Sequence, residues 1–424
     1  MKRKISFITL ACVLVIASRG FASPEIPGAK QSEPIAIVNA TVFPMSSEPL
    51  PNATLLFEEG KIVAVGQQIE IPENAQRIDA TGKHVYPGLI NAGGQIGLIE
   101  INSIKATDDS REVGTLNPNV KAQVAVNPDS EIIPVTRANG VLMSLSVPRG
   151  GLISGTSALL QLDGWTWEEM TLSAPAAMHI QWPNVGSSGN KDPLQTLVEL
   201  FESVDDYAKA IDAGAAVDVR LDAMLPVVQG KLPVVAHANT TLQIQSAVAF
   251  AAERKLPLII FGGYDAPYCA RLLKQHDVPV IVSSVYRLPR RRSDAFDESY
   301  TIPERLRQAG VKFCIAGVGR FSAASLRNLP YHAATAAAYG LSEEEALKAI
   351  TLYPAQILGV ADQVGSLEVG KHATLIVSDG SPLATETQVE HAFIQGRPVD
   401  LESRHTRLWK KYRVKYDRIR DSQP

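Results

Sequence analysis

Polar side chains that can bind ligands or transfer protons stand near the ends of several apolar runs in this sequence. His237 stands in the apolar run 233–238, and His179 and Gln181 stand in a similar run, 177–182. Imidazole titrates near neutral pH and also binds metals, so these two histidines are the first candidates for acid–base chemistry. The other candidates for a substrate pocket are Gln95, Arg149, Asn239, Tyr264 and Asp265.

The sequence leaves two roles open for the imidazoles. Each is either a polar residue of the interior held by hydrogen bonds, or a group that contacts substrate, with His237 as the catalytic base. A metal or acid–base set would also need a carboxylate, for which Glu100 and Asp265 are the candidates. No spacing rule brings these residues together, so metal ligation by them is the less favoured interpretation.

Two further segments have compositions that suit anion binding. Residues 148–157 are rich in glycine and hydroxyl groups, so they predict either a backbone cradle for a polar ligand or a tight reversal of the chain. Residues 290–292 are three arginines followed closely by acidic residues, which favours a self-paired surface loop over an anion clamp. The sequence has no phosphate loop, nucleophile elbow or dinucleotide fingerprint in a suitable setting.

The elements that must position these side chains are apolar runs that alternate with helical stretches. Runs rich in Val, Ile and Leu are typical of a parallel sheet buried on both faces. They span about 230 residues and predict an α/β fold, a (β/α)8-type (TIM) barrel with some distortion. The runs are residues 85–90, 140–147, 177–182, 233–238, 257–261, 278–285 and 311–317, with 215–219 as a weak candidate for the eighth strand.

A barrel of this kind gathers the carboxyl ends of its parallel strands at one mouth, where function is expected. Residues 102–136 show no periodicity and contain many Asp, Asn and Pro, so they predict a long loop over one mouth. Alternating strands in residues 34–87 and 363–400 predict a small β-sandwich built from both ends of the chain, which leaves 88–362 for the barrel.

Residues 401–424 read as a basic C-terminal helix or tail. Trp409, Tyr412, Tyr416 and Ile419 recur at helical spacing among many Lys and Arg residues. The favoured interpretation is a terminal helix whose aromatic stripe packs on the domain while its cations face water. A helix that binds a membrane or nucleic acid is the alternative.

Composition and the first residues bound the class of protein. The chain has 424 residues, 45% of them hydrophobic, which excludes a disordered, collagenous or coiled-coil protein.

Residues 1–22 have the basic start, apolar centre and small residues of a signal peptide, so an exported, periplasmic or extracellular product is expected. Their removal takes away four cations and moves the formal net charge from -3 to -7, which gives no reason to expect a nucleic-acid partner. The apolar centre is too short for a transmembrane span. Cys269 and Cys314 are expected to be buried free thiols.

Three motifs in their order along the chain carry a family resemblance. They are Asp-Ala-Thr-Gly-Lys at 79–83, Val-Tyr-Pro-Gly-Leu-Ile-Asn-Ala at 85–92, and Gly-Ser-Leu-Glu-Val-Gly-Lys at 365–371. Over residues 34–399 the sequence resembles the amidohydrolase superfamily, and within it the imidazolonepropionase-like periplasmic amidohydrolases. The resemblance implies hydrolysis of a carbon–nitrogen bond in a cyclic or other non-peptide amide. It also implies a divalent metal held by a His-X-His pair after the first barrel strand, by histidines of two later strands and by a final Asp.

The sequence departs from this pattern at the implied metal ligands. Gly93 and Gln95 stand where the first two histidines would be, Phe261 replaces a later one, and the last strand runs to Gly319 without a carboxylate. A catalytic zinc needs at least three N, O or S donors and an open position for water. The sequence therefore predicts a degenerate metal site and no cofactor, unless a rearranged site holds zinc.

Two hypotheses from different classes follow. The first is an exported amidohydrolase-related hydrolase with a rearranged site, in which His237 is the base or the lone ligand. The second is a catalytically inactive barrel of the same fold that binds a ligand or serves as an assembly module. Both involve a small molecule at the barrel mouth or a protein surface, and a homo-oligomer is compatible with either. The sequence leaves open whether catalysis survives.

Overall fold

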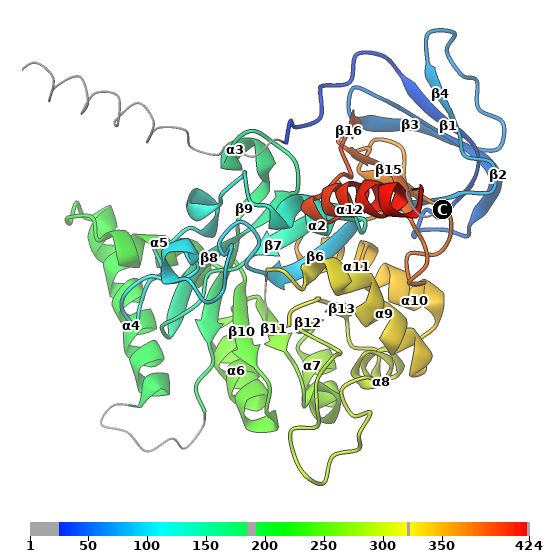
Figure 1. Cartoon of the computed structure of the whole chain (residues 1–424). Helices are drawn as coiled ribbons and strands as arrows, with labels where there is room; N and C mark the ends of the chain where they lie inside the picture. The colour runs from blue at the N-terminus through cyan, green and yellow to red at the C-terminus, as the bar shows by residue number, and fades with distance from the viewer. Residues whose placement is uncertain (1–24, 185–191, 320–322, 422–424) are drawn as a thin grey trace, which may run out of the picture.

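The structure is a computed structural model that describes residues 25–184, 192–319 and 323–421. The expected signal peptide, residues 1–22, lies outside the described residues. Two eight-stranded sheets dominate the fold. One sheet curls into a barrel that is covered by helices, and the other forms a smaller unit beside it (Figure 1).

The barrel sheet has the strand order β13-β12-β11-β10-β9-β8-β7-β6 and is nearly closed, which confirms the predicted barrel. At the seam the Asn91 side-chain oxygen accepts a hydrogen bond from the Gly317 N–H at 2.8 Å. The strands are β6 (Leu89–Gly94), β7 (Val141–Ser146), β8 (Ile153–Gln161), β9 (Thr171–Gln181), β10 (Val234–Ala238), β11 (Leu258–Gly262), β12 (Val280–Val282) and β13 (Phe313–Ile315).

The eighth barrel strand is β8, and it runs antiparallel to both of its neighbours, β7 and β9. The prediction for residues 215–219 is wrong, because 215–218 form an exposed connection and Val219 begins helix α5 (Val219–Val228). A short connection can join antiparallel strands only, and here Gly150 and Gly151 turn the chain with φ of 90° and 66°. Residues 148–157 are therefore a tight reversal that continues into β8.

The predicted strand 85–90 is in fact two strands in two different sheets. β5 (His84–Pro87) belongs to the smaller unit, and β6 begins the barrel one residue after Gly88. A side chain at Gly88 would place its Cβ 2.9 Å from the Leu142 side chain. Glycine therefore allows the chain to pass closely over the barrel wall between the two sheets.

The second sheet joins both ends of the chain, as predicted for the composite sandwich. Its strand order is β16-β15-β14-β5-β1-β2-β3, and β4 also pairs with β1. Phe57, Val85 and Phe393, which come from both ends of the chain, are buried in one apolar cluster. The strands are β1 (Ile35–Val42), β2 (Leu50–Glu58), β3 (Lys61–Gly66), β4 (Gln76–Asp79), β14 (Leu375–Ser378), β15 (Val389–Ile394) and β16 (Arg397–Pro398).

Helices follow most of the later barrel strands and cover the outside of the sheet (Figure 1). Helix α6 (Thr241–Arg254) is typical of them. Thr240 caps its first turn in a capping box with Gln243, and its apolar side is buried on the barrel. The residue after its last turn, Lys255, has the left-handed conformation that ends the helix. The other helices are α2 (Ile132–Arg137), α3 (Trp167–Met170), α4 (Pro193–Asp212), α5 (Val219–Val228), α7 (Ala270–Gln275), α8 (Ile302–Ala309), α9 (Leu329–Ala338), α10 (Glu343–Lys348), α11 (Leu352–Ile357) and α12 (Arg404–Asp421), with α6 at Thr241–Arg254.

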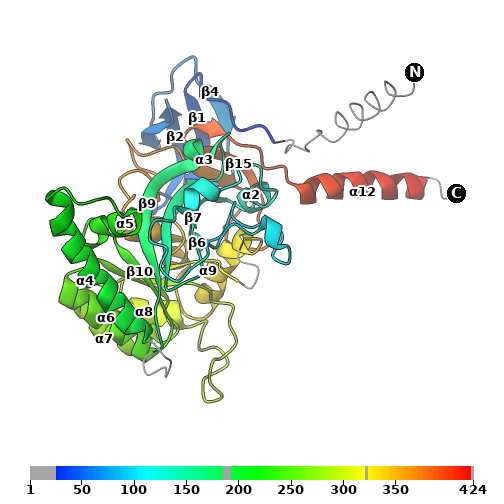
Figure 2. The ribbon, with the colours of Figure 1, turned by 90° about the vertical axis from the view of Figure 1, so that its left-hand side faces the viewer.

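Two expectations about the interior and the C-terminal segment have different outcomes. Cys269 and Cys314 are buried and free, as predicted. The prediction that the aromatic stripe of α12 packs on the domain is wrong, since α12 has no buried residue and Trp409 is 60% exposed. The helix projects away from the body (Figure 2). In the described parts of the chain, none of the helices has the length and apolar character needed to cross a membrane.

A buried arginine joins the barrel to both ends of the chain. Arg137 donates hydrogen bonds to the Leu162 carbonyl at 2.8 Å and the Asp400 carbonyl at 2.9 Å, and it forms an ion pair with Asp163 at 3.3 Å. A second ion pair, to Glu25 at 3.3 Å, brings in the N-terminal segment. Burial raises the pKa of Asp163, so its ionised form depends on the partner cations.

We expect Arg137→Ala to lower the free energy of unfolding by about 3–5 kcal/mol, because it leaves the Asp163 carboxylate buried without its main partner. Urea unfolding at neutral pH measures the change. Lys209→Ala removes an exposed ion pair with Asp206 and is the matched control, for which a change below about 0.5 kcal/mol is expected. Equal effects of the two substitutions would contradict this role for Arg137.

Candidate ligand site at the barrel mouth

A cavity of about 330 Å³ opens at the carboxyl ends of the barrel strands, where function is expected. Side chains from strand ends on both sides of the mouth contribute to it, together with one residue of the long loop after β6. The lining residues are Gly94, Gln95, Arg111, Val147, Arg149, Gly150, Gln181, His237, Phe261, Val318 and Gly319.

The structure brings the two candidate histidines into direct contact. His179 and His237 stand on the adjacent parallel strands β9 and β10, and the His179 Nδ1 and His237 Nε2 atoms are 3.0 Å apart. Burial lowers the pKa of His237 to about 4, and burial together with the neighbouring ring lowers the pKa of His179 well below its usual value. Both rings are therefore neutral at pH 7, and one donates its proton to the other in a hydrogen bond.

The Phe261 ring fills the space beside this pair. Its centroid lies 4.7 Å from that of His237. A Cβ atom built on Gly93 would lie 2.5 Å from Phe261 Cε2, which is closer than any carbon contact allows. The phenyl ring and a side chain at position 93 therefore exclude each other.

These residues do not fit the metal that the family resemblance implies. In the described ranges, no group of three His, Cys, Asp or Glu side chains is placed to hold a metal ion. His179 Nδ1 and His237 Nε2 form a hydrogen bond with each other and are not free to bind a metal. The amide nitrogen of Gln95 donates a hydrogen bond to the Val147 carbonyl at 3.3 Å. Gly93 and Gly319 supply no donor, and Phe261 supplies an apolar ring.

Two guanidinium groups give the cavity a positive character. Arg149 and Arg111 both line it, and no carboxylate does so among the residues that the structure describes. Burial, and then the nearby charge of Arg111, lower the pKa of Arg149, and the Asp108 carboxylate at 3.9 Å opposes this only in part. An anion in the cavity would relieve the repulsion between the two cations.

Two polar atoms near the mouth are buried without a hydrogen-bond partner, namely Gln95 Oε1 and His179 Nε2. Such an atom costs about 1–3 kcal/mol when it is left unpaired. Gln95 lines the cavity, so a ligand or water with a donor group would satisfy its oxygen.

Of the residues predicted from sequence, Gln95, Arg149, Gln181 and His237 line the cavity, with His179 directly behind His237. Asn239, Tyr264 and Asp265 are engaged elsewhere. The Asn239 side chain accepts a hydrogen bond from Arg287 at 2.9 Å, and the Tyr264 hydroxyl donates to Asp294 at 2.9 Å.

Asp265 is buried and accepts a hydrogen bond from the Thr241 N–H at 3.0 Å. It also pairs with Arg291, which contacts Asp294 of its own loop as well, whereas the Arg290 guanidinium lies 5.6 Å from the Tyr264 ring centroid. Pairing within the arginine-rich loop is therefore seen at Arg291. Glu100 accepts a hydrogen bond from Asn127 and does not join the histidine pair. Sequence reasoning missed Arg111, whose only signal was its place in the loop predicted to cover a mouth.

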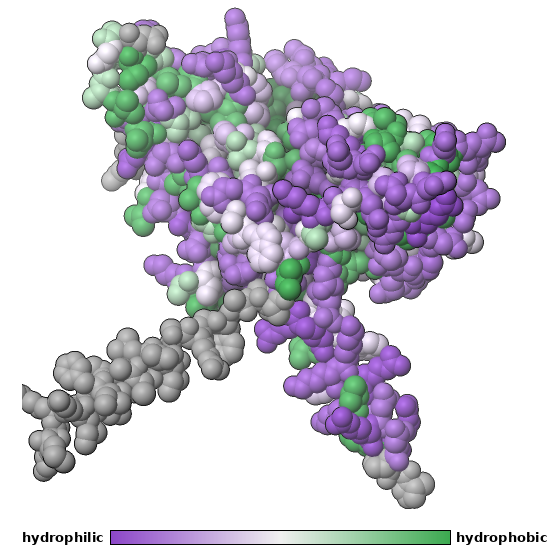
Figure 3. Space-filling view, turned by 90° about the horizontal axis from the view of Figure 1, so that it is seen from above, coloured by the Kyte–Doolittle hydropathy of each residue, from purple (hydrophilic) through white to green (hydrophobic). Residues whose placement is uncertain are grey.

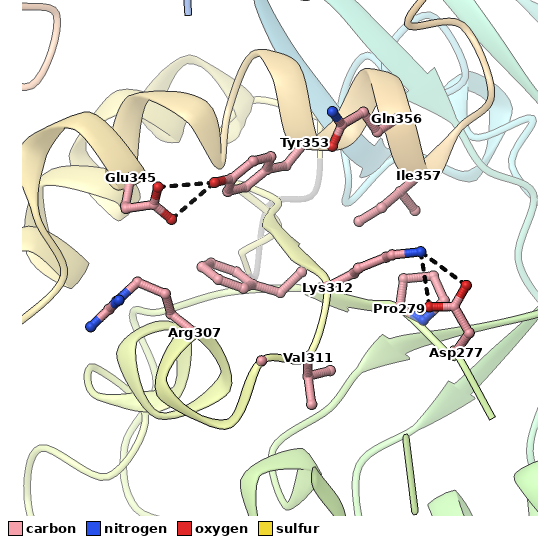
Figure 4. A pocket seen from close by; sticks show the side chains of 11 residues that line it. Asp277, Pro279, Arg307, Val311, Lys312, Glu345, Tyr353, Gln356 and Ile357 are labelled. Carbon is pink, nitrogen blue, oxygen red and sulfur yellow. Dashed lines mark hydrogen bonds and ion pairs between the residues drawn. The ribbon is translucent and has the colours of Figure 1, made fainter. Parts of the chain in front are cut away.

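A second cavity, of about 600 Å³, lies at the opposite end of the barrel, beside the amino ends of β12 and β13 (Figure 4). Its charged groups have partners within or beside the cavity, and Arg307 pairs with Glu304 at 2.7 Å. Lys312 contacts Asp277 at 2.8 Å, and the Tyr353 hydroxyl donates to Glu345 at 2.9 Å. Polar groups satisfied in this way at the amino end of a barrel are typical of a stabilising role.

Comparison with known proteins decides the family. Residues 174–401, more than half of the chain, match the Amidohydrolase family. The chain belongs to the amidohydrolase family. Among solved structures, an amidohydrolase from Thermotoga maritima aligns with a TM-score of 0.79 and 28% identity, over 86% of this chain and 99% of that one.

Curated relatives of this amidohydrolase-family chain are more distant. An imidazolonepropionase of Mesorhizobium japonicum is 24% identical over 83% of this chain and 90% of its own length. The amidohydrolase tasK of Hapsidospora irregularis is 21% identical over 89% of this chain, and the match spans only 45% of that relative. These matches agree with the family resemblance and with the imidazolonepropionase-like character seen in the sequence.

The contact between Gly93 and Phe261 makes a specific prediction for this amidohydrolase-family barrel. We expect Gly93→Ala to destabilise the protein by about 1–3 kcal/mol, because the new Cβ overlaps the Phe261 ring. In a Phe261→Ala background the same substitution should cost little, which gives a coupling energy of about 1 kcal/mol or more in a double-mutant cycle. Urea unfolding of the four proteins measures it, and additive effects would show that the ring does not restrict position 93.

Proposed function

We propose that this amidohydrolase-family protein binds a small anionic molecule at its barrel mouth and does not carry out metal-dependent hydrolysis. The observation that carries the proposal is the Phe261 ring, which stands against His237 and in the space of a side chain at Gly93. We also propose that residues 1–22 direct export to the periplasm or cell exterior, and that the protein is a degenerate member of the imidazolonepropionase-like periplasmic branch.

The donor groups at the mouth support the loss of the metal site. Tight binding of a catalytic zinc needs three protein donors, and among the described residues at the mouth only His179 and His237 offer imidazoles. To ligate a metal, the pair would have to give up its mutual hydrogen bond in a buried, apolar setting. Phe261 offers no donor that could complete a metal site. The buried setting therefore favours the neutral, hydrogen-bonded histidine pair over a metal complex.

Charge and size support an anionic ligand. Arg111 and Arg149 face a cavity of about 330 Å³ whose other polar side chains include the amides of Gln95 and Gln181. Guanidinium groups bind carboxylates through charge-assisted hydrogen bonds, and amides suit the polar edge of a lactam ring. A cyclic amide that carries a carboxylate combines both features and agrees with the family resemblance.

Hydrolysis without a metal is the second candidate, and the contact between the two histidines favours it. A base that is oriented by a neighbouring hydrogen-bonding group is a common catalytic arrangement, and His179 could orient His237 in this way. The lowered pKa of His237, about 4, opposes this function, because a base works best when its pKa lies near the working pH.

The first test of the proposal is metal binding. We expect neither zinc, manganese nor EDTA to change the thermal unfolding of the purified chain, because a bound metal at 100 times its dissociation constant would add about 2.7 kcal/mol of stability. A Gly93→His/Gln95→His/Phe261→His variant should gain stabilisation by zinc, and adding His237→Ala to that variant should remove most of the gain. Stoichiometric metal in the unaltered protein, with loss of stability in EDTA, would overturn the proposal.

The second test is ligand charge. We expect calorimetry to detect 2-pyrrolidone-5-carboxylate and to find binding of neutral 2-pyrrolidone at least about tenfold weaker, because only the former can pair with Arg149. Arg149→Gln should lose this preference, while Arg220→Gln on the exposed start of α5 should keep it. Equal binding of the two rings would contradict an anion site. Ring opening to glutamate that disappears in His237→Ala would instead establish the second candidate.

A further inference from the structure

The C-terminal helix α12 differs in charge from the rest of the chain. Its 18 residues contain eight Lys and Arg and two Asp, whereas the whole chain has a formal net charge of -3. The cations of Arg404, Lys411, Lys415 and Arg418 form no ion pair with another described residue. The helix is therefore a strongly positive element on an acidic protein.

Most of the apolar side chains of α12 gather on one face, and Val414 falls on the opposite side. At about 100° per residue, Leu408, Trp409, Tyr412 and Tyr416 fall within an arc of about 100°. Trp409 is 60% exposed, Tyr412 48% and Tyr416 64%, so the part of the body that the structure describes leaves this face uncovered. We call these four residues the aromatic face of α12.

Cations border the aromatic face on both edges. The same geometry places Lys411 and Lys415 along one edge and Arg413 along the other. The Lys415 ammonium lies 5.9 Å from the Tyr416 ring centroid, and the Arg413 guanidinium lies 5.2 Å from that of Trp409. The two aspartates fall on the opposite side of the helix.

Among the described residues, the ion pairs that join α12 to the rest of the chain come from its first two turns. Arg407 pairs with Glu131 at 3.2 Å, and Lys410 pairs with Glu402 at 2.6 Å in the preceding segment. Beyond this point the helix extends away from the body (Figure 2), and from above it is a mostly hydrophilic arm with a few apolar side chains (Figure 3). Its aromatic face is therefore open to a partner along most of its length.

We propose that α12 docks this protein on an anionic phospholipid surface. An apolar face with Trp and Tyr enters the headgroup boundary, where the flat rings contact acyl chains and their polar atoms contact water. Lys and Arg at the edges of such a face extend outward to the phosphates while their alkyl stems stay in the apolar layer. The helix is too highly charged to span the bilayer, so it rests at the interface.

The order of charged and apolar residues favours lipid over other partners. A nucleic-acid surface places cations at the centre of contact, whereas here the centre is apolar and the cations are at the edges. Pairing of two aromatic faces from two copies would bring together helices that each carry a net charge of +6. A bilayer with anionic headgroups can contact both parts of the helix, because its acyl boundary meets the aromatic face and its phosphates meet the cations at the edges.

Co-sedimentation with vesicles tests the proposal on the whole chain. We expect binding to vesicles of phosphatidylcholine with 30% phosphatidylglycerol, weakened by salt, and little binding to phosphatidylcholine alone. Each cation near such a surface strengthens binding about fivefold, so Lys411→Glu/Lys415→Glu should weaken it at least about 20-fold. Arg220→Glu/Lys231→Glu makes the same change of charge at exposed positions on and just after α5 and should leave binding nearly unchanged.

Trp409 supplies a second, independent readout. Its fluorescence should shift to shorter wavelength and become protected from acrylamide when anionic vesicles are added, and the shift should be absent in Trp409→Phe. Circular dichroism checks that α12 remains helical in each variant. Cation substitutions that leave vesicle binding intact would overturn the proposal, as would equal binding to both kinds of vesicle. Binding of duplex DNA or self-association through α12, without vesicle binding, would also overturn it.

Discussion

The contact between one phenyl ring and one glycine limits which side chains the barrel mouth can hold. Phe261 packs on His237 and occupies the volume beside Gly93, so the mouth is lined by an apolar wall where the family resemblance implies metal donors. His179 and His237 are buried beside this ring, so both imidazoles are neutral and they form a hydrogen bond with each other. The polar side chains that line the cavity include Arg149 and Gln95.

Much of the barrel could be predicted from sequence, because parallel strands buried on both faces are uninterrupted apolar runs. β8 was missed for the same reason. It is buried along its whole length, yet Ser154, Thr156 and Ser157 interrupt its apolar pattern and resemble a loop. α12 was predicted as a helix, but propensity and periodicity do not show whether an amphipathic face meets a partner.

The candidate site was predictable where a residue stands in the last positions of a strand. Gln181 and His237 project from strand ends into the mouth, whereas Tyr264 and Asp265 follow Gly262 and Gly263, whose φ angles of 109° and 63° redirect the chain. Arg111 comes from a loop without periodicity, so only tertiary structure brings it beside Arg149. The sequence shows Gly93, Gln95 and Phe261 where the resemblance implies histidines, but it does not show the steric exclusion between Phe261 and a side chain at position 93.

The composite sheet cannot form until strands from both ends of the chain have been synthesised. β5 pairs with β14, and β14 with β15, although nearly 290 residues separate β5 from β14 along the chain. Until the ribosome has released β14, one edge of β5 has no partner strand and is open to pairing with another chain. Translation therefore finishes most of the polypeptide before this sheet can close, and a product shortened before β14 would keep that edge exposed.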